Sequence, residues 1–421
     1  MAGGVAKMMR QFTFDRASLA NVLLTVGLYL MGFSAPISLT LFSLGIVLVI
    51  TGWILRGNWW ESWRAATAYP VTAPLLIFLG YVLVTTTYSD GDWEHTGRVL
   101  GAYLKLLYLP LVLSCYGYVT SGQRLIDVFY AGCVCLLVMV WTDVLVDLPW
   151  SRERGTGFGV NHTIFMTYIS QGMALNGCAL YAWFKAQMAE SVWKRSFHYC
   201  VCALALIGVF ALNGSRIGYI TGIGVTLVLV LSSWRERRGG GALATVLVGL
   251  LVAAVFSPLL ENRIDQLLTD LLRYTSPESA DTSLGTRLGM AALSLELISQ
   301  APIFGHGLGD YRLMALPFFD EGYARSASAI APTNQILFIG VEMGLVGVSL
   351  FAFVIACLLR PLISVAPPYK SLAAGAAWIV FVDAMGHHPI WDAGERQISL
   401  LLVLLVCVVP RIFPQQRQEE S

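Results

Sequence analysis

The chain has 421 residues and a formal net charge of +1; 56% of its residues are hydrophobic, only 13% are charged, and the mean hydropathy is +0.67. Soluble domains carry about 25% charged residues, so this composition excludes an ordinary soluble enzyme, and a near-zero charge without a basic patch gives no sign of nucleic-acid binding. Long continuous apolar runs recur along the sequence and favour membrane-spanning helices, because lipid offers the backbone no hydrogen bonds.

These runs predict an all-α polytopic membrane protein with about twelve transmembrane helices. Most lysines and arginines fall between alternate spans, which the positive-inside rule places in the cytoplasm together with both ends of the chain. We therefore predict cytoplasmic tails at 1–17 and 414–421, nine spans over 18–258, a periplasmic loop at 259–332 and three spans over 333–413. The predicted spans are 18–33, 36–55, 72–88, 98–118, 124–148, 163–184, 197–213, 216–234, 242–258, 333–359, 370–386 and 396–413.

Two predicted outer segments carry arginines against the positive-inside rule. Arg152 and Arg154 lie between the fifth and sixth spans, and the long loop contains Arg287 and Arg312 among others. Long loops cross the membrane regardless of charge, which accounts for the loop better than for the short Arg152 segment. Anion binding explains both segments, so these arginines are candidate ligands for an anionic donor.

The long loop is predicted to contain two helices. Leucines at helical spacing over 260–271 predict an amphipathic helix at the membrane interface. A second helix is predicted to begin at Asp281–Ser283 and to end before Pro302. Arg287 lies near its start, where the helix dipole and free N–H groups favour an anion. The residues predicted to face inward are Leu288, Ala291, Leu295 and Ile298.

A glycine-rich turn, Gly305-His306-Gly307-Leu308-Gly309, follows the second helix. Its glycines permit a tight turn and a close approach of the backbone to a ligand, although ordinary turns use the same residues. His306 is either a general base or a surface histidine.

Polar residues also occur at the ends and in the interior of predicted spans. Arg216, in Asn213-Gly214-Ser215-Arg216, marks the outer end of two spans. It either snorkels to the headgroups or clamps a diphosphate with its planar fork of donors. Lys105, Glu342 and Asp383 lie inside spans, where ionisable groups line a cavity or form a structural pair. For Lys105 and Glu342, far from the outer ends, the structural pair is favoured.

The last outer connection gathers further groups suited to proton transfer. His387, His388, Asp392 and Glu395 lie within one short turn and are alternative candidates for a base or for acceptor positioning. Adjacent histidines are poor joint metal ligands, and all eight cysteines fall in predicted spans. The sequence therefore predicts neither a metal site nor a cofactor.

Several motifs together carry a resemblance to a known family. They run in the order Asn213–Gly218, Gly285–Gly289, Pro302–Tyr311 and Pro332–Leu337, the last continuing into Val341–Gly347. Their order around one long outer loop resembles that of bacterial O-antigen ligases. The wider family includes O-antigen polymerases and protein O-oligosaccharyltransferases.

The resemblance implies a GT-C-like glycosyltransferase of the bacterial inner membrane, acting at the periplasmic face in lipopolysaccharide biosynthesis. It would transfer O-antigen polysaccharide from undecaprenyl diphosphate to lipid A-core with inversion, and without ATP or a metal. Arg216 and Arg287 match the family's two functional arginines. The family's functional histidine precedes an asparagine, whereas here Thr333 precedes Asn334. The base is therefore open between His306 and the histidines of the last connection, with Thr333 as an alternative that only positions the acceptor.

Three other functions are compatible with such a chain. A second arginine-rich outer loop would favour an O-antigen polymerase, and a soluble periplasmic extension would favour a protein O-oligosaccharyltransferase. A lipid-linked-glycan flippase or secondary transporter would show repeats with broken midplane helices. We find one arginine-rich loop and no internal repeat, which favours the ligase.

Overall fold

The computed structural model describes residues 16–116, 122–235, 283–318 and 331–412, together with residue 249 and residues 261–262, 265–266 and 268–270. Helices form all the regular structure in this described part. The helices are α2 (Arg16–Ser34), α3 (Leu39–Arg56), α4 (Trp59–Thr67), α5 (Thr72–Thr85), α6 (Trp93–Leu104), α7 (Tyr108–Tyr116), α8 (Gly122–Leu145), α9 (Tyr168–Met188), α10 (Val192–Ala211), α11 (Arg216–Arg235), α14 (Ser283–Gln300), α15 (Asp310–Ala315), α17 (Gln335–Leu359), α18 (Tyr369–Gly386) and α19 (Ala393–Ile412), with short 3-10 turns at η1 (Lys105–Leu107), η3 (Leu316–Phe318) and η5 (Arg360–Ser364).

Eight helices in the described part are long and apolar enough to cross a membrane, or nine if α4 and α5, bent by 100°, count as one span. The protein is thus a multi-pass membrane protein, and its described part holds fewer such helices than the sequence predicts for the whole chain. α9 and α18 match predicted spans but are not among the eight. The predicted span 242–258 lies outside the described residues, apart from residue 249. A total of about twelve spans therefore stays a prediction.

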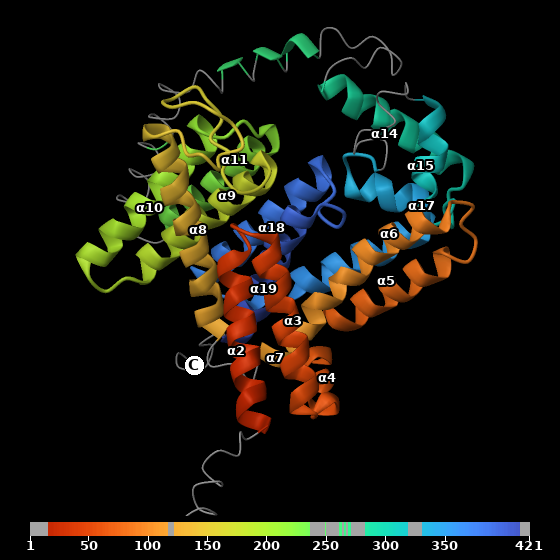
Figure 1. The fold of residues 1–421 in the computed structure, drawn as a ribbon, viewed down its shortest axis with the longest axis horizontal. Coiled ribbons are helices and arrows are strands. Elements are labelled where there is room, and N and C mark those ends of the chain that lie inside the picture. Colours follow the sequence, from red (N-terminus) through yellow and green to blue (C-terminus); the bar gives the residue numbers. More distant parts are fainter. Residues whose placement is uncertain are drawn as a thin grey trace, which may run out of the picture.

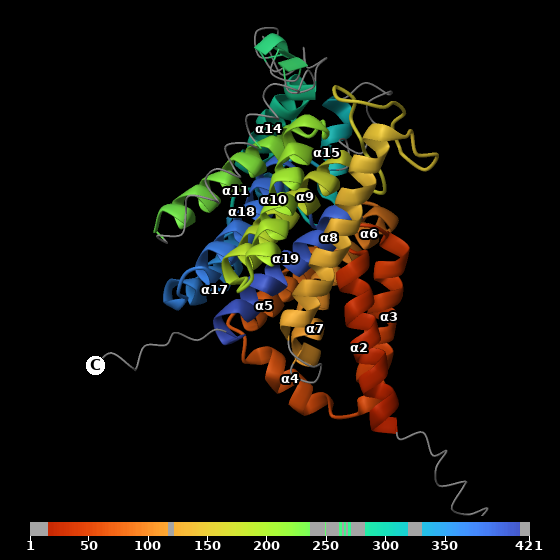
Figure 2. The ribbon, with the colours of Figure 1, turned by 90° about the vertical axis from the view of Figure 1, so that its left-hand side faces the viewer.

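The helices form one bundle with two distinct ends. In Figures 1 and 2, α14 and α15 lie at one end together with the connection between α8 and α9, and α4 lies at the opposite end. We call the first of these the loop end. α11 and α17 begin at the loop end, at Arg216 and directly after Asn334, and α18 ends there at Gly386.

α14 forms where the second loop helix was predicted, from Ser283 to Gln300. Its predicted inward face is wrong in part, because Leu295 is 59% exposed while Leu293 and Leu297 are buried. α14 packs along α17, and this contact turns Met290, Leu293 and Leu297 inward instead. The other predicted loop helix, 260–271, lies largely outside the described residues.

The glycine-rich turn is joined to a kink in α17. Gly344 has φ of 60°, which interrupts the helix, and His306 N donates to Val341 O (2.9 Å). Glu342, fully buried, accepts from Gly309 N (2.9 Å). The structural pair favoured for Lys105 and Glu342 is therefore wrong: Glu342 anchors this turn, while Lys105 lies in η1 on the wall of a hollow described below.

Replacing Gly344 with alanine is expected to destabilise the protein by about 2–4 kcal/mol. Alanine disfavours positive φ, and its Cβ would lie 2.4 Å from Ile303 O. The measurement is the Tm of the purified protein. Gly97→Ala is the matched control, because a Cβ at Gly97 in α6 meets nothing within 4 Å; equal Tm values for the two variants would contradict the prediction.

Candidate functional site

The C-terminus of α18 is where several of the predicted site residues meet. The last carbonyl groups of a helix have no partners within the helix. Two side chains from other helices supply donors here: Asn334 Nδ2 donates to Met385 O (2.9 Å), and Arg287 Nη1 donates to Gly386 O (3.2 Å). A cation at a helix C-terminus is also favoured by the helix dipole. Arg287, from α14, and Asn334, from the start of α17, thus converge on one turn.

Asn334 has a second role that fixes its position. It is the N-cap of α17, and its Oδ1 accepts from Ile336 N (2.9 Å) and Leu337 N (3.0 Å). Asp, Asn, Ser and Thr are preferred at this position because the side chain satisfies free N–H groups. Thr333 immediately precedes this cap and is partly exposed. The cap therefore holds Thr333 close to the end of α18.

Arg216 is the first residue of α11 and approaches the same region from the other side. Its Nη1 and Nη2 bond to Asp270 Oδ2 (3.2 and 3.3 Å), and its side chain is 25% exposed. The neighbouring Ile217 packs on Gly386, whose added Cβ would lie 3.0 Å from Ile217 Cδ1. Gly386 thus contacts both Arg287 and Ile217, the residue that follows Arg216. The guanidinium of Arg216 therefore already pairs with one carboxylate of the protein.

The segment before Arg216 is held by a polar network. Gly214 N donates to Asn161 Oδ1 (2.9 Å), and Ser215 N donates to Asn213 Oδ1 (2.9 Å). Ser215 Oγ in turn accepts from Gly218 N (3.0 Å), which caps the start of α11. Because the backbone before Arg216 is held at each residue, the guanidinium projects from a rigid base.

His387 lies directly after α18 and pairs with Glu395 in the first turn of α19. His387 Nδ1 is 2.5 Å from Glu395 Oε2, and the Glu395 side chain is fully buried. The His388 ring stacks on the His387 ring with centroids 4.3 Å apart. A carboxylate on one ring nitrogen fixes the orientation of an imidazole and leaves the other nitrogen to exchange a proton.

Burial lowers the pKa of His387 from 6.5 to about 4, and the charge of Arg287 acts in the same direction. Burial also lowers the pKa of His388, to about 3, reinforced by His387. Asp392 opposes both shifts without cancelling them. Both rings are therefore neutral near pH 7, and a neutral imidazole can accept a proton.

Buried polar atoms without partners in the described residues gather beneath this connection. They are both carboxyl oxygens of Asp383, Glu395 Oε1 and His388 Nδ1. Asp383 lies within electrostatic range of Glu395 and Asp392. Native structures satisfy most buried polar groups, so each exception calls for an explanation. A concentration of such exceptions beside Arg287 is typical of a site that receives polar substrate groups.

Not every predicted site residue lies here. His306 Nε2 bonds to Leu297 O (2.8 Å), which is about 15 Å further along α14 than Arg287 at 1.5 Å per residue. Arg312, on α15, lies beside Asp92 and His95 at the start of α6. Asp392 caps α19, its Oδ1 accepting from Gly394 N (2.9 Å). These three side chains have structural contacts of their own.

Arg152 and Arg154 belong to the connection between α8 and α9. Arg154 donates to the carbonyl groups of Leu148 and Pro149 (3.1 Å each), and Arg152 is exposed. Neither has a contact with Arg216 or Arg287 in the described part of the chain. The same connection is joined to the segment before Arg216 by Asn161, whose Oδ1 accepts from Gly214 N. Sequence reasoning missed Asn161 because a lone asparagine in a loop carries no signal.

Two further residues were missed. Asp270 lies within the predicted loop helix 260–271 and was not among the candidate site residues, although an acidic residue among outer arginines is a natural partner for one of them. Gln335 is fully buried, and its Oε1 accepts from Ile390 N (3.4 Å). Gln335 directly follows Asn334 in the motif Pro332–Leu337, and this position could have identified it as a candidate site residue.

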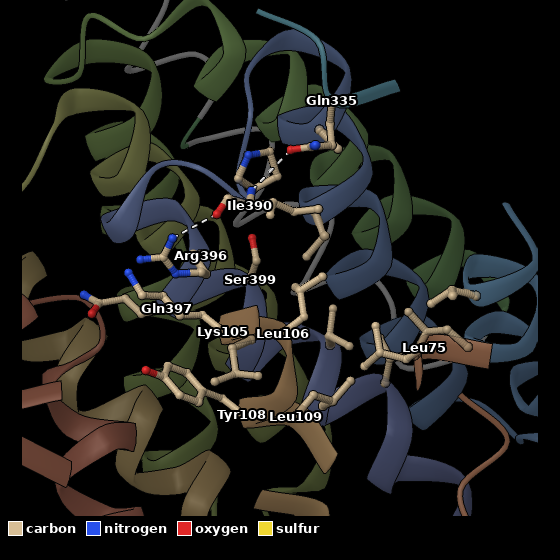
Figure 3. A pocket seen from close by; sticks show the side chains of 18 of the residues that line it. Leu75, Lys105, Leu106, Tyr108, Leu109, Gln335, Ile390, Arg396, Gln397 and Ser399 are labelled. Carbon is tan, nitrogen blue, oxygen red and sulfur yellow. Dashed lines mark hydrogen bonds between the residues drawn. The ribbon is translucent and has the colours of Figure 1, made fainter. Parts of the chain in front are cut away.

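A hollow of about 720 Å³ opens below the last connection. Figure 3 shows Gln335, Ile390 and Arg396 at its upper part, and Leu75, Leu106 and Leu109 among the apolar side chains below. Met385 and Pro389 also line it. The connection that carries His387 is thus in contact with a large apolar space inside the bundle.

Parts of this chain are similar to known proteins. A protein of Haemophilus influenzae, described as an uncharacterized protein, is 29% identical over 308 residues, which are 68% of this chain and 70% of that relative. Residues 201–352 match the sequence pattern of a family described as O-antigen ligase. The match contains Arg216, Arg287 and Asn334, but it ends before His387. Residues 201–352 of this chain are therefore similar to the O-antigen ligase family.

Proposed function

We propose that this protein is an inverting glycosyltransferase that moves O-antigen polysaccharide from undecaprenyl diphosphate to lipid A-core. It acts in the bacterial inner membrane with the loop end facing the periplasm. The observation that carries the proposal is that Arg287 and the start of α11, where Arg216 lies, both contact the end of α18, next to the buried His387–Glu395 pair. This reaction requires cations that stabilise the leaving diphosphate and a base that accepts the proton of the acceptor hydroxyl.

The arginines would hold the diphosphate of the donor. As the bond between the sugar C1 and the phosphate oxygen breaks, negative charge develops on the diphosphate, and preorganised cations stabilise that charge. The planar guanidinium matches phosphate oxygens with two parallel donors. Asp270 now takes up this fork of Arg216, so the donor would replace one anion by another of higher charge.

His387 would activate the acceptor. The hydroxyl oxygen of the acceptor sugar attacks C1 from the face opposite the diphosphate, which inverts the anomeric centre. Its proton passes to Nε2 of His387, while Nδ1 stays paired with Glu395, and the diphosphate leaves with the electron pair of the broken bond. Thr333, where related chains have a histidine, would position the acceptor rather than remove its proton.

The experiment is transfer in vesicles that contain only the purified full chain, undecaprenyl-diphosphate-linked glycan and lipid A-core. Formation of capped lipid A-core, and of free undecaprenyl diphosphate in equal amount, is expected. Parallel vesicles offer a second lipid-linked glycan or a serine-containing peptide as the acceptor. Transfer to either of these but not to lipid A-core would reject the ligase in favour of a polymerase or a protein-modifying enzyme.

Treatment with EDTA is expected to leave the transfer rate unchanged, because the two arginines supply the positive charge that a metal would otherwise provide. The rate is measured before and after chelation and after adding back Mg²⁺ or Mn²⁺. Loss of transfer with EDTA and its restoration by either ion would contradict the prediction.

A further inference from the structure

The hollow below the last connection has walls made almost entirely of apolar side chains. They come from α3, α5, α7, α17, α18 and α19, and no residue of α9, α11 or α14 is among them. Leu39 and Val47 of α3 and Phe381 of α18 line it and are exposed, at 43%, 56% and 50%. In a membrane, these side chains would meet lipid. The hollow is therefore open to the bilayer from the side.

Two cations share the polar part of this apolar space. Arg396 is fixed there, because its Nη1 donates to Ile390 O (2.9 Å) and Trp391 O (3.2 Å). Lys105 lies in the middle of the span Trp93–Tyr116, and its charge is close enough to that of Arg396 for the two to repel each other. Figure 3 shows the two side chains on the same wall.

Within the described part of the chain, one carboxylate, that of Asp392, acts electrostatically on Arg396, and none acts on Lys105. The residues that line the hollow include no Asp or Glu, and Lys105 has no hydrogen bond or ion pair within the described part of the chain. A cation at membrane depth is costly unless it has a partner or a function. Ser399 also lines the hollow, is only 8% exposed, and has a hydroxyl without a partner among the described residues. A bound ligand with oxygen atoms would satisfy all three groups.

The hollow and the arginine site lie on different sides of one connection. Met385, Pro389 and Ile390 line the hollow, whereas Arg287 of α14 and Ile217 of α11, next to Arg216, contact Gly386. Trp378 lines the hollow too, and its Nε1 donates to Thr221 O of α11 (3.2 Å), so it forms part of the wall between them. A lipid in the hollow would therefore be separate from one whose diphosphate is held by the arginines.

We propose that this hollow binds the lipid anchor of the acceptor: an acylated, phosphorylated glycolipid whose chains lie along the apolar walls and whose phosphate is held by Lys105 and Arg396. The volume, about 720 Å³, is within the usual range of about 300–1,000 Å³ for ligand sites. The assignment to the acceptor rests on the proposed function, which gives the donor diphosphate to Arg216 and Arg287. Each of the two lipid substrates then has its own entrance, and the acceptor sugar emerges beside His387.

The test measures binding of lipid A to the purified full chain in nanodiscs without any donor. Lys105→Gln is expected to weaken lipid A binding about tenfold, the value of one charge-assisted contact. Lys105→Arg, which keeps the charge, restores binding. Arg98→Gln is the control, because Arg98 lies on α6 outside the hollow and pairs with Glu94. Ala377→Phe, which narrows the hollow without changing charge, is expected to weaken binding as well.

Three other probes decide what the site recognises. Undecaprenyl diphosphate, phosphatidylglycerol and inorganic phosphate are each expected to bind equally well to wild type and Lys105→Gln. If undecaprenyl diphosphate loses as much affinity as lipid A, the hollow belongs to the donor and the proposal is wrong. An equal loss of affinity for phosphatidylglycerol would overturn the proposal in favour of a general lipid site. An equal loss of affinity for inorganic phosphate would overturn it in favour of a simple anion site. Unchanged lipid A binding in Lys105→Gln would also overturn the proposal.

Kinetics supply an independent readout once transfer is established. Lys105→Gln should raise the KM for lipid A-core about tenfold and leave the KM for the donor unchanged. Lipid A binding is measured without the donor and so does not depend on transfer. If the protein binds lipid A but shows no transfer, the proposed glycosyltransferase activity is wrong and the proposed lipid site stands.

Discussion

Arg287→Ala is expected to lower the rate of glycan transfer by about two to three orders of magnitude, as loss of one preorganised charge-stabilising group does in other enzymes. Arg216→Ala should have an effect of the same size. Each guanidinium would stabilise the charge that appears on the departing diphosphate, so the loss should appear in kcat as well as in kcat/KM. The measurement is transfer to lipid A-core by reconstituted variants at matched protein amounts.

Arg287 also donates to Gly386 O, so the alanine variant could lose structure as well as charge. Arg287→Lys separates these effects, because lysine keeps a cation and one donor but not the planar fork. We expect Arg287→Lys to keep the wild-type Tm and still to lose most of the activity. Arg98→Ala, which removes an exposed arginine from α6, should change neither. Normal transfer by Arg216→Ala or Arg287→Ala would reject the diphosphate clamp.

His387→Gln is expected to reduce transfer by about two to four orders of magnitude, the usual range for a general base. Glu395→Gln should also reduce it, because the neutral amide holds the imidazole less well than a carboxylate. Because burial lowers the pKa of His387 to about 4, the ring stays neutral as the pH falls through 6.5. The wild-type rate should therefore remain level through pH 6.5 and decline only as the pH approaches about 4.

His306→Ala and Thr333→Ala distinguish this assignment from the alternatives. His306 bonds to Leu297 O far along α14, so its replacement should affect the Tm more than kcat. Thr333→Ala should reduce transfer less than either arginine change. A complete loss with Thr333→Ala and near-normal transfer with His387→Gln would place the base at the start of α17 instead. A decline in wild-type rate centred on pH 6.5 would likewise contradict a buried His387 as base.

Much of the fold follows from local properties of the sequence. Continuous apolar runs can form only helices in lipid, so α2, α3, α8 and α11 lie close to the predicted spans. Start and stop signals were equally local: α14 begins at Ser283 and ends before Pro302. The choice of which face of α14 is buried does not follow from the local sequence, because the contact of α14 with α17 determines it.

The site could be predicted only as a set of candidates. Arg216, Arg287 and Asn334 stand out because each lies in a recognisable motif, and polar residues at the ends of apolar spans are conspicuous. Nothing in the spacing of His306 and His387 distinguishes them, since both follow a helix and precede a turn. The structure separates them: His306 bonds to a carbonyl of α14, and His387 pairs with a buried glutamate beside Arg287.

The sequence by itself determined that the chain crosses a membrane repeatedly and which residues could bind an anion, because hydropathy and charge act residue by residue. Only the tertiary structure decided which of these groups meet. The end of α18 leaves carbonyl groups that need donors, and Arg287 and Asn334 reach them from helices far away in the sequence. The hollow with Lys105 and Arg396 likewise exists only once η1, α17, α18 and α19 pack together, since a cavity belongs to no single segment.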